Sequence, residues 1–348
     1  MTPPRLIALG NGVWLDEICT EGKAPIKDVP GGSITYSVLG ARLFTPLDPK
    51  TITLMFNAGH DFPEDLITLF RGWSIDLVVN HVLDRPSARG RVFYENANAN
   101  RKGFERLTEP LPVNVKQLER YPDCLQSQAF HFFGSANYLQ AQVNDLLHLR
   151  KGVVAEGCTP ALPLIVWEPH AKSCLPATLQ QHLDAMKFVD VFSPNHEELH
   201  SFWGNPIPFD RLLVEREAAA FVQAGIGPRG DGCIIVRAAG AGVLAMSETI
   251  APRWLPSYYK PDSERIFDPT GAGNAFLGGF IIGLQNTGDR LQAIHHGQVA
   301  ASFALEQVGV PSHNGEGADE RWNGEKVSER LAKYQGRLQA SLTVLMCT

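Results

Sequence analysis

A short run of small residues is the stretch of this sequence best suited to chemistry: Gly271, Ala272, Gly273 and Asn274. Small side chains leave the backbone N–H groups of a turn accessible to a ligand, and the N–H groups at a helix start carry about half a positive charge. An apolar run with paired glycines follows at 275–280, which is typical of a tightly packed helix. The pattern therefore predicts an anion-binding loop; a glycine-rich loop that only turns the chain is the alternative.

A polar pair follows a predicted strand earlier in the chain. Asn195 and Glu198 stand three residues apart, directly after the apolar run 189–193. Asn is a favoured helix N-cap and a Glu three residues later makes a near capping box, so a structural role is one interpretation. A binding role is the other, and both can hold at once.

Composition excludes several function classes. The 348 residues are 44% hydrophobic and carry a formal net charge of -6, which argues against a nucleic-acid binder. No run approaches the roughly 20 apolar residues that span a bilayer, and the N-terminus lacks the apolar region of a signal peptide. Six scattered cysteines without a Cys-x-x-Cys pair favour a reduced, cytoplasmic protein without a zinc site.

Strand-like and helix-like segments alternate along most of the chain. Apolar runs typical of buried strands lie at 6–9, 51–56, 77–80, 129–133, 164–168, 189–193, 233–238 and 243–246. Helix-like segments lie at 33–43, 63–70, 138–151, 176–186, 195–202, 212–224 and 291–307. This alternation predicts an α/β fold with a largely parallel sheet and helices on both faces.

Two stretches depart from this alternation. Residues 91–94 and 104–107 look like two strands joined by a tight exposed connection at 96–100, so a surface hairpin is one interpretation. Near the C-terminus, a polar stretch at 312–323 precedes an amphipathic helix that ends at about 339. We expect this C-terminal segment to be surface structure with no chemistry.

The stretch 268–280 resembles the C-terminal signature of the pfkB (ribokinase-like) carbohydrate kinase family, which is usually Asp-Thr-x-Gly-Ala-Gly-Asp followed by a Phe and paired glycines. The resemblance runs from about Leu6 to Val310, and the segments 167–169, 273–274 and 306–309 resemble a fungal, maintenance-of-killer-like subgroup. It implies a ribokinase-like three-layer α/β sandwich with a mostly parallel central sheet and a small β lid. The chain 1–348 would then be a single domain, with lid segments near 13–31 and 87–110.

The resemblance also assigns roles to the residues of the signature. Gly271, Ala272 and Gly273 would form the anion hole for in-line transfer of the γ-phosphoryl group of ATP. Asn274 stands where the family has the Asp that accepts the proton of the substrate hydroxyl, and an amide cannot accept it near neutral pH. Because phosphoryl transfer depends mostly on positioning and electrostatics, this change predicts either a slow kinase or an inactive one.

Further nucleotide and cation sites are implied in the same way. Asn195 and Glu198 match the family's Asn-x-x-Glu, which organises Mg²⁺ and nucleotide phosphates through waters. Members of the family often bind a monovalent cation at the Asp that corresponds to Asp268, so Asp268 and Glu198 are the predicted metal residues. The predicted nucleotide contacts are Asn195, Glu198, Arg237, Gly240, Gly242 and Thr270.

The substrate side departs further from the family. Tyr36 stands where the family has an Asn that binds a sugar hydroxyl, and Glu168 and Lys172 replace an Asp and an Arg. These changes make an ordinary hexose or pentose a poor candidate for the substrate. The predicted substrate contacts are Asp16, Gly31, Gly32, Tyr36, Glu168 and Lys172.

Two functions follow from these assignments. The first is a pfkB-type ATP-dependent phosphotransferase that acts on a hydroxyl of an atypical small molecule. The second is a repurposed family member that binds nucleotide or another anion and serves in binding, assembly or chemistry that needs no base at position 274. In both, the partner is a small molecule rather than nucleic acid or a membrane, and the family resemblance implies a homodimer formed through the lid.

Overall fold

The computed structural model describes residues 3–94, 101–153, 161–204 and 208–346. The chain divides into two compact units, the first made of Met1–Gly12 and Pro112–Ser257 and the second of Val13–Leu111 and Tyr258–Thr348. The chain enters each unit twice, so segments far apart in sequence meet inside each one. The single domain expected over 1–348 stays a prediction.

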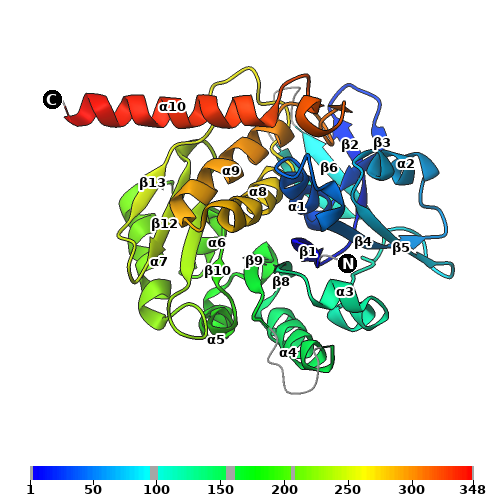
Figure 1. Cartoon of the computed structure of the whole chain (residues 1–348), viewed down its shortest axis with the longest axis horizontal. Helices are drawn as coiled ribbons and strands as arrows, with labels where there is room; N and C mark the ends of the chain where they lie inside the picture. The colour runs from blue at the N-terminus through cyan, green and yellow to red at the C-terminus, as the bar shows by residue number, and fades with distance from the viewer. Residues whose placement is uncertain (1–2, 95–100, 154–160, 205–207, 347–348) are drawn as a thin grey trace. The chain divides into compact units, whose positions relative to one another are not determined.

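The first unit is built on a mostly parallel sheet. Its strands are β1 (Leu6–Leu9), β8 (Ala129–Gly134), β9 (Leu164–Pro169), β10 (Val191–Phe192), β11 (Cys233–Arg237), β12 (Val243–Ser247) and β13 (Arg253–Leu255). They lie in the order β13-β12-β11-β10-β9-β8-β1. β12 pairs antiparallel with both β11 and β13, and the remaining described pairings of this order are parallel. Its helices are α3 (Pro122–Leu125), α4 (Ala136–Gly152), α5 (Leu179–Ala185), α6 (His196–Ser201) and α7 (Arg211–Ala224) (Figure 1). The parallel strands are almost wholly buried, as expected where helices cover a sheet.

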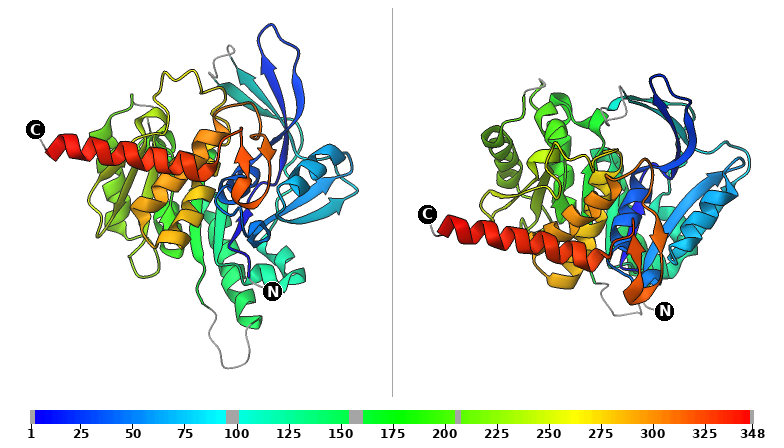
Figure 2. Two further views of the ribbon diagram at one scale, coloured as in Figure 1. Left: turned by 45° about the horizontal axis from the view of Figure 1, so that its top comes forward. Right: turned by 90° about the horizontal axis from the view of Figure 1, so that it is seen from above.

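The second unit combines a parallel strand pair with a small sheet. The parallel pair is β4 (Ile52–Gly59) and β5 (Asp76–Val82). The small sheet, called the lid sheet below, contains β2 (Trp14–Thr20), β3 (Ile26–Gly31), β6 (Arg89–Tyr94) and β7 (Arg101–Arg106) in the order β3-β2-β6-β7 (Figure 2). Two antiparallel pairs, β2-β3 and β6-β7, are joined by the parallel pairing of β2 with β6. A short hairpin, β14 (His313–Asn314) and β15 (Arg321–Trp322), completes the strands of this unit among the described residues.

Helices of the second unit pack closely because glycines face them. They are α1 (Ser33–Arg42), α2 (Glu64–Gly72), α8 (Ala272–Thr287), α9 (Arg290–Ala304) and α10 (Val327–Met346). α8 packs against both α1 and α9 (Figure 1). A Cβ on Gly278 would lie 1.8 Å from Ser37 O, and one on Gly40 would lie 2.0 Å from Ala275 O. The close packing predicted from the paired glycines is therefore confirmed, and it fixes the start of α8 on α1.

The strands of the lid sheet lie within the lid segments that the family resemblance implied. The two strands expected at 91–94 and 104–107 are present as β6 and β7, while the connection at 96–100 lies outside the described residues. The polar stretch that follows β1 forms β2 and β3, within the segment 13–31. Ile18 of β2 packs with Val92 and Tyr94 of β6, so pairing with a distant strand outweighs the local polarity. Among the described residues, no helix has the length and apolar character needed to cross a bilayer.

Candidate functional site

Helix α8 begins at the predicted anion-binding loop. Gly271 is its N-cap and has a φ of 78°, in the left-handed region that glycine adopts without strain. The first hydrogen bond within the helix joins Ala275 N to Gly271 O at 2.9 Å, so the N–H groups of Gly273 and Asn274 precede it. Residues 271–274 are partly exposed. The start of α8 therefore offers backbone donors and the positive end of a helix dipole to an anion.

Asn274 is the third residue of α8, and it stands beside those donors. Its side chain is partly exposed, and the first turn of the helix contains no acidic residue. An amide carries no charge and has no basic site near neutral pH. The first turn of α8 therefore adds no carboxylate that would repel an anion, and position 274 cannot take a proton from a hydroxyl.

Asp268 holds the loop from inside. It is 1% exposed, and its Oδ1 accepts hydrogen bonds from Thr270 N at 2.8 Å and from the Tyr94 hydroxyl at 2.5 Å. The Tyr94 hydroxyl also lies 2.8 Å from Thr270 Oγ1. Within the second unit, a strand of the lid sheet is thus bonded directly to the predicted loop. In the described part of the chain, no group of three or more His, Cys, Asp and Glu side chains is arranged to hold a metal, so a cation at Asp268 stays a prediction.

The predicted substrate residues of the second unit lie together. A Cβ on Gly271 would lie 2.2 Å from the ring of Tyr36, which is 2% exposed. Burial, followed by the negative charges of Asp268 and Asp16, raises the pKa of Tyr36 well above its ordinary value, so its hydroxyl stays protonated. Asp16 is also buried, and a Cβ on Gly31 would lie 2.0 Å from its Oδ2. Both side chains therefore face the chain itself, Tyr36 against the N-cap of α8 and Asp16 against Gly31.

Gly32 and Gly31 form the turn into α1. Gly32 is the N-cap of α1 and has a φ of 92°, a conformation that requires glycine. Gly31 O accepts a hydrogen bond from Thr35 Oγ1 at 2.7 Å. The paired glycines thus let the chain turn sharply and approach Asp16, while contact of their backbone with a substrate stays a prediction.

The charged residues predicted in the first unit gather around Arg237, at the end of β11. Arg237 Nη1 lies 2.9 Å from Glu168 Oε1, and Nη2 lies 3.6 Å from Glu198 Oε2. Nη2 also donates to Ser193 O at 3.0 Å. On its other side, Glu168 lies 3.5 Å from His131 Nε2. One guanidinium therefore lies between two buried carboxylates that come from β9 and α6.

Asn195 and Glu198 form the capping box that one interpretation predicted. Glu198 N donates to Asn195 Oδ1 at 2.8 Å, and Asn195 N donates to Glu198 Oε2 at 2.7 Å. The structural role of the pair at the start of α6 is therefore confirmed. Its role towards Mg²⁺ and phosphates stays a prediction.

The two carboxyl groups beside Arg237 titrate differently. Burial raises the pKa of Glu198 to about 7; Arg237 opposes this shift and the charge of Glu168 adds to it. Burial also acts on Glu168, but Arg237 and His131 outweigh it and hold the pKa of Glu168 below its ordinary value. The shorter distance from Arg237 to Glu168 explains the difference, because attraction grows as two charges approach.

We expect the substitution Glu198→Gln to flatten the pH dependence of stability. In the folded chain Glu198 binds its proton more tightly than in the unfolded chain. The contribution of Glu198 to the free energy of unfolding is therefore fully present below its ordinary pKa of about 4.3. This contribution is lost as the pH rises through about 7. In urea unfolding, the free energy of unfolding of the native chain should fall between about pH 5 and about pH 8. In the variant this fall should be smaller by roughly 1–3 kcal/mol. Glu197→Gln, at the exposed neighbouring position, should keep the native slope, and a native slope in Glu198→Gln would contradict the assignment.

The turn between β11 and β12 contains Gly240 and Gly242, two of the predicted nucleotide contacts. Gly242 has a φ of 96°, and a Cβ there would lie 2.1 Å from Leu255 O, so glycine is required. The other left-handed position is Ala239, with a φ of 44°, rather than Gly240. A non-glycine residue in this region costs about 1–2 kcal/mol. Contact of this turn with a nucleotide stays a prediction for Arg237, Gly240 and Gly242.

The structure thus divides the predicted site residues into two groups. The first unit brings together Glu168, Asn195, Glu198 and Arg237, and the second brings together Asp16, Gly31, Tyr36, Asp268, Thr270 and Gly271. Lys172 is exposed on the first unit, where its backbone N–H donates to His170 Nδ1 at 3.2 Å.

Sequence reasoning missed Tyr94 and His131. Both lie on strands that were expected, at the end of β6 and inside β8. A histidine inside the apolar run Ala-Phe-His-Phe-Phe was a usable signal, because a buried polar group needs a partner. The hydrogen-bond partner of Tyr94 is Asp268, which lies 174 residues away, so the local sequence does not predict this contact.

Comparisons with known proteins agree with this arrangement. A family model described as pfkB family carbohydrate kinase matches residues 134–314, just over half of the chain. An uncharacterized protein of Schizosaccharomyces pombe is 30% identical over 92% of this chain and 90% of its own length. The protein MAK32 of Saccharomyces cerevisiae is 27% identical over 99% of this chain and 96% of its own.

Solved structures are similar over nearly the whole chain. A ribokinase of Giardia lamblia superposes with a TM-score of 0.69, at 14% identity, over 96% of this chain and all of its own. Phosphofructokinase-2 of Escherichia coli, in complex with substrates and products, gives a TM-score of 0.64 at 15% identity over 95% of this chain and 99% of its own. At these identities the likeness concerns the fold.

Proposed function

Because this chain belongs to the pfkB family of carbohydrate kinases, we propose that it is a pfkB-type ATP-dependent phosphotransferase that acts slowly on a hydroxyl of an atypical small molecule. The ribokinase-like α/β fold expected from the sequence, with a mostly parallel sheet and a small lid sheet, is confirmed. The observation that carries the proposal is the start of α8. There Gly271 turns the chain, and the partly exposed residues Gly273 and Asn274 precede the residue that makes the first helical hydrogen bond.

The residues present fit a phosphate group at this loop. Backbone donors at a helix start stabilise negative charge, and Asn274 adds no opposing carboxylate. ATP, when bound, supplies the γ-phosphoryl group. In the proposal Gly273 and Asn274 donate their N–H groups to that phosphoryl group and stabilise the charge that spreads over its oxygens during transfer.

The predicted Mg²⁺ residues, Asn195 and Glu198, fit the metal less well than the start of α8 fits a phosphate group. Asn195 Oδ1 and Glu198 Oε2 already accept hydrogen bonds from each other's backbone. The pKa of Glu198 is about 7, so this carboxyl group is only partly ionised near neutral pH. These two side chains would therefore hold Mg²⁺ through waters rather than by direct contact. The proposal derives no step from the metal or from a monovalent cation at Asp268.

The slow rate follows from Asn274. A positioned general base contributes typically 10²–10⁴-fold, and an amide supplies none of it. Phosphoryl transfer nevertheless passes through a loose transition state in which positioning and electrostatics do most of the work. In the proposal the acceptor hydroxyl loses its proton to solvent, late in the step, while the start of α8 stabilises the transferred group.

The substrate side argues for an unusual acceptor. Tyr36 and Asp16 are buried against Gly271 and Gly31, so these two side chains present no row of open polar groups to an acceptor. A sugar with many hydroxyls would leave several of them without partners, which costs about 1–3 kcal/mol each. The proposed substrate is therefore a small molecule with few hydroxyls.

A second function is favoured by the same burial. If Tyr36 and Asp16 keep their contacts when the loop is occupied, no acceptor reaches the start of α8. The chain would then bind nucleotide or another anion without transferring phosphate, as a binding or assembly protein. The contact of the Tyr36 ring with Gly271 is the observation that favours this reading.

Binding and turnover separate the two functions. Calorimetry with ATP and Mg²⁺ is expected to show binding at or below millimolar nucleotide; no binding there would contradict both. A screen across hydroxyl-bearing compounds, read by ADP release, should then show slow turnover with a small alcohol if the first function holds. Binding without turnover on any acceptor would leave the second function.

We also propose that the chain forms a homodimer through the lid sheet. Its strands expose Ile26, Phe93 and Phe104, apolar side chains that a partner copy would cover. Light scattering of the purified protein at micromolar concentration tests this, and a monomer throughout would overturn it.

A further inference from the structure

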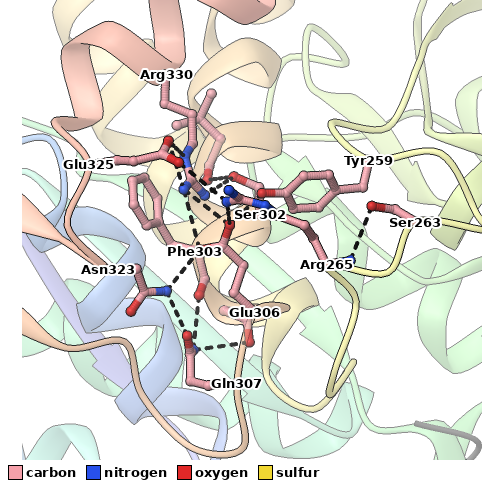
Figure 3. A network of polar contacts seen from close by, with 12 residues as sticks. Tyr259, Ser263, Arg265, Ser302, Phe303, Glu306, Gln307, Asn323, Glu325 and Arg330 are labelled. Carbon is pink, nitrogen blue, oxygen red and sulfur yellow. Dashed lines mark hydrogen bonds and ion pairs between the residues drawn. The ribbon is translucent and has the colours of Figure 1, made fainter. Parts of the chain in front are cut away.

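The C-terminal segment, expected to be surface structure with no chemistry, contains a buried arginine. Arg330 of α10 has a side chain that is 0% exposed, and it lies between Glu306 and Glu325 at 3.1 and 3.0 Å. It also donates to Ser302 Oγ at 3.1 Å and lies 3.7 Å above the ring of Phe303 (Figure 3). A charge this deeply buried is retained only where partners surround it.

Glu306, directly after α9, is the centre of this network. Its partners come from the loop before α8, from Asn323 and from Arg330 of α10 (Figure 3). Arg265 Nη1 donates to it at 3.0 Å, Asn323 Nδ2 at 2.8 Å, Arg330 Nη2 at 3.3 Å, and the Tyr259 hydroxyl donates as well. Burial would raise the pKa of Glu306, but Tyr259, Asn323 and Arg330 outweigh burial and lower it, so the carboxylate stays charged.

This network is joined to the loop that begins α8. Leu305, the residue before Glu306, accepts hydrogen bonds through its carbonyl from Phe267 N at 2.7 Å and Asp268 N at 3.2 Å. Arg265, two residues before Phe267, is bonded to Glu306 itself. The stretch 265–268 is therefore attached to the end of α9 both through its backbone and through a side chain.

We propose that Arg265, Glu306 and Arg330 form a clamp that positions the anion-binding loop. The clamp fixes the position of the backbone at Asp268, and the side chain of Asp268 in turn accepts a hydrogen bond from Thr270 N, directly before Gly271. Arg330 brings α10 into this arrangement, so the C-terminal helix is part of the site although it contacts no ligand. The three residues are positioning residues, and the inference rests on the proposed anion binding at α8.

The exposed member of the clamp gives the cleanest test. Arg265 is 58% exposed, so Arg265→Met should leave the melting temperature nearly unchanged. We expect the affinity for inorganic phosphate and for ATP, measured by calorimetry, to fall by about 3- to 10-fold because a looser loop must be ordered on binding. Amide hydrogen exchange at 271–275 should become faster, and Arg265→Lys should recover part of both effects.

A matched control lies on α2. Arg71 is 62% exposed and pairs with Glu64 at 3.0 Å, so Arg71→Met removes an equivalent surface pair from the same unit. It should change neither phosphate affinity nor exchange at 271–275. Arg330→Lys, which keeps the charge but loses the planar fork, should act in the same direction as Arg265→Met; if it fails to fold, the Arg265 result decides.

The outcomes separate this inference from the proposed function. If the native protein binds neither phosphate nor ATP, the proposed function fails, and amide exchange alone still tests the clamp. If Arg265→Met leaves both exchange and affinity at the level of Arg71→Met, the clamp is overturned and the network only stabilises the fold.

Discussion

Replacing Asn274 by aspartate is expected to raise the rate of phosphoryl transfer by about 10²–10⁴-fold, the usual contribution of a positioned general base. The carboxylate would stand in the first turn of α8, beside the N–H donors and in reach of the proton that an acceptor hydroxyl must lose. ADP release with the acceptors from the turnover screen measures the gain. If only the variant transfers phosphate, the native chain is a binding protein.

The same substitution should have two smaller effects of known sign. A negative charge at a helix start stabilises the helix by about 0.3–1 kcal/mol, so the variant should unfold at slightly higher urea. The charge also repels phosphate, so nucleotide affinity should fall several-fold at low salt and recover as salt screens it. Faster turnover with tighter binding would contradict this account.

Asn286→Asp is the matched control. It makes the same chemical change in the last turn of the same helix, at an exposed position. We expect it to leave turnover unchanged and to destabilise α8 slightly, because negative charge is unfavourable at a helix C-terminus. A rise in turnover in this control would show that the gain at position 274 does not come from a base.

Replacing Gly271 by alanine is expected to lower the free energy of unfolding by about 2–5 kcal/mol and to abolish anion binding. A φ of 78° costs a residue with a Cβ about 1–2 kcal/mol, and the overlap with the buried ring of Tyr36 costs about 1–3 kcal/mol more. Relief of the overlap would move the N-cap and turn the donors at the start of α8 away from the ligand. Urea unfolding and phosphate calorimetry measure the two effects.

A substitution at Gly288, at the other end of α8, separates the cost of backbone strain from the cost of overlap with the Tyr36 ring. The φ of Gly288 is 68°, and a Cβ there would meet nothing within 4 Å. Gly288→Ala should therefore cost only the backbone strain of about 1–2 kcal/mol and leave phosphate affinity unchanged. Equal losses in Gly271→Ala and Gly288→Ala would rule out the steric role of Tyr36.

A double variant tests the contact directly. If Tyr36 is the obstacle, Gly271→Ala combined with Tyr36→Ala should cost less than the sum of the two single losses, because the new Cβ fills part of the space left by the ring. An additive result would mean that the two residues do not interact.

The sequence by itself determined most of the order of elements, the loop at the start of α8 and the presence at position 274 of an amide, which has no basic site near neutral pH. These follow from local physics. Continuous apolar runs favour buried strands, and glycines allow tight turns and close packing, wherever they occur. The type of side chain at position 274 fixes whether it can accept a proton. The capping box of Asn195 and Glu198 was also legible, since its two partners are three residues apart.

Only the tertiary structure decided what surrounds these features. The ring of Tyr36 packs against Gly271. Arg237 forms ion pairs with both Glu168 and Glu198, and Arg330 forms one with Glu306. The packing of Ile18 in β2 against β6 could not be predicted locally for the same reason. In each case the deciding partner lies tens to hundreds of residues away, and the energy of a buried contact depends on that partner rather than on the local sequence.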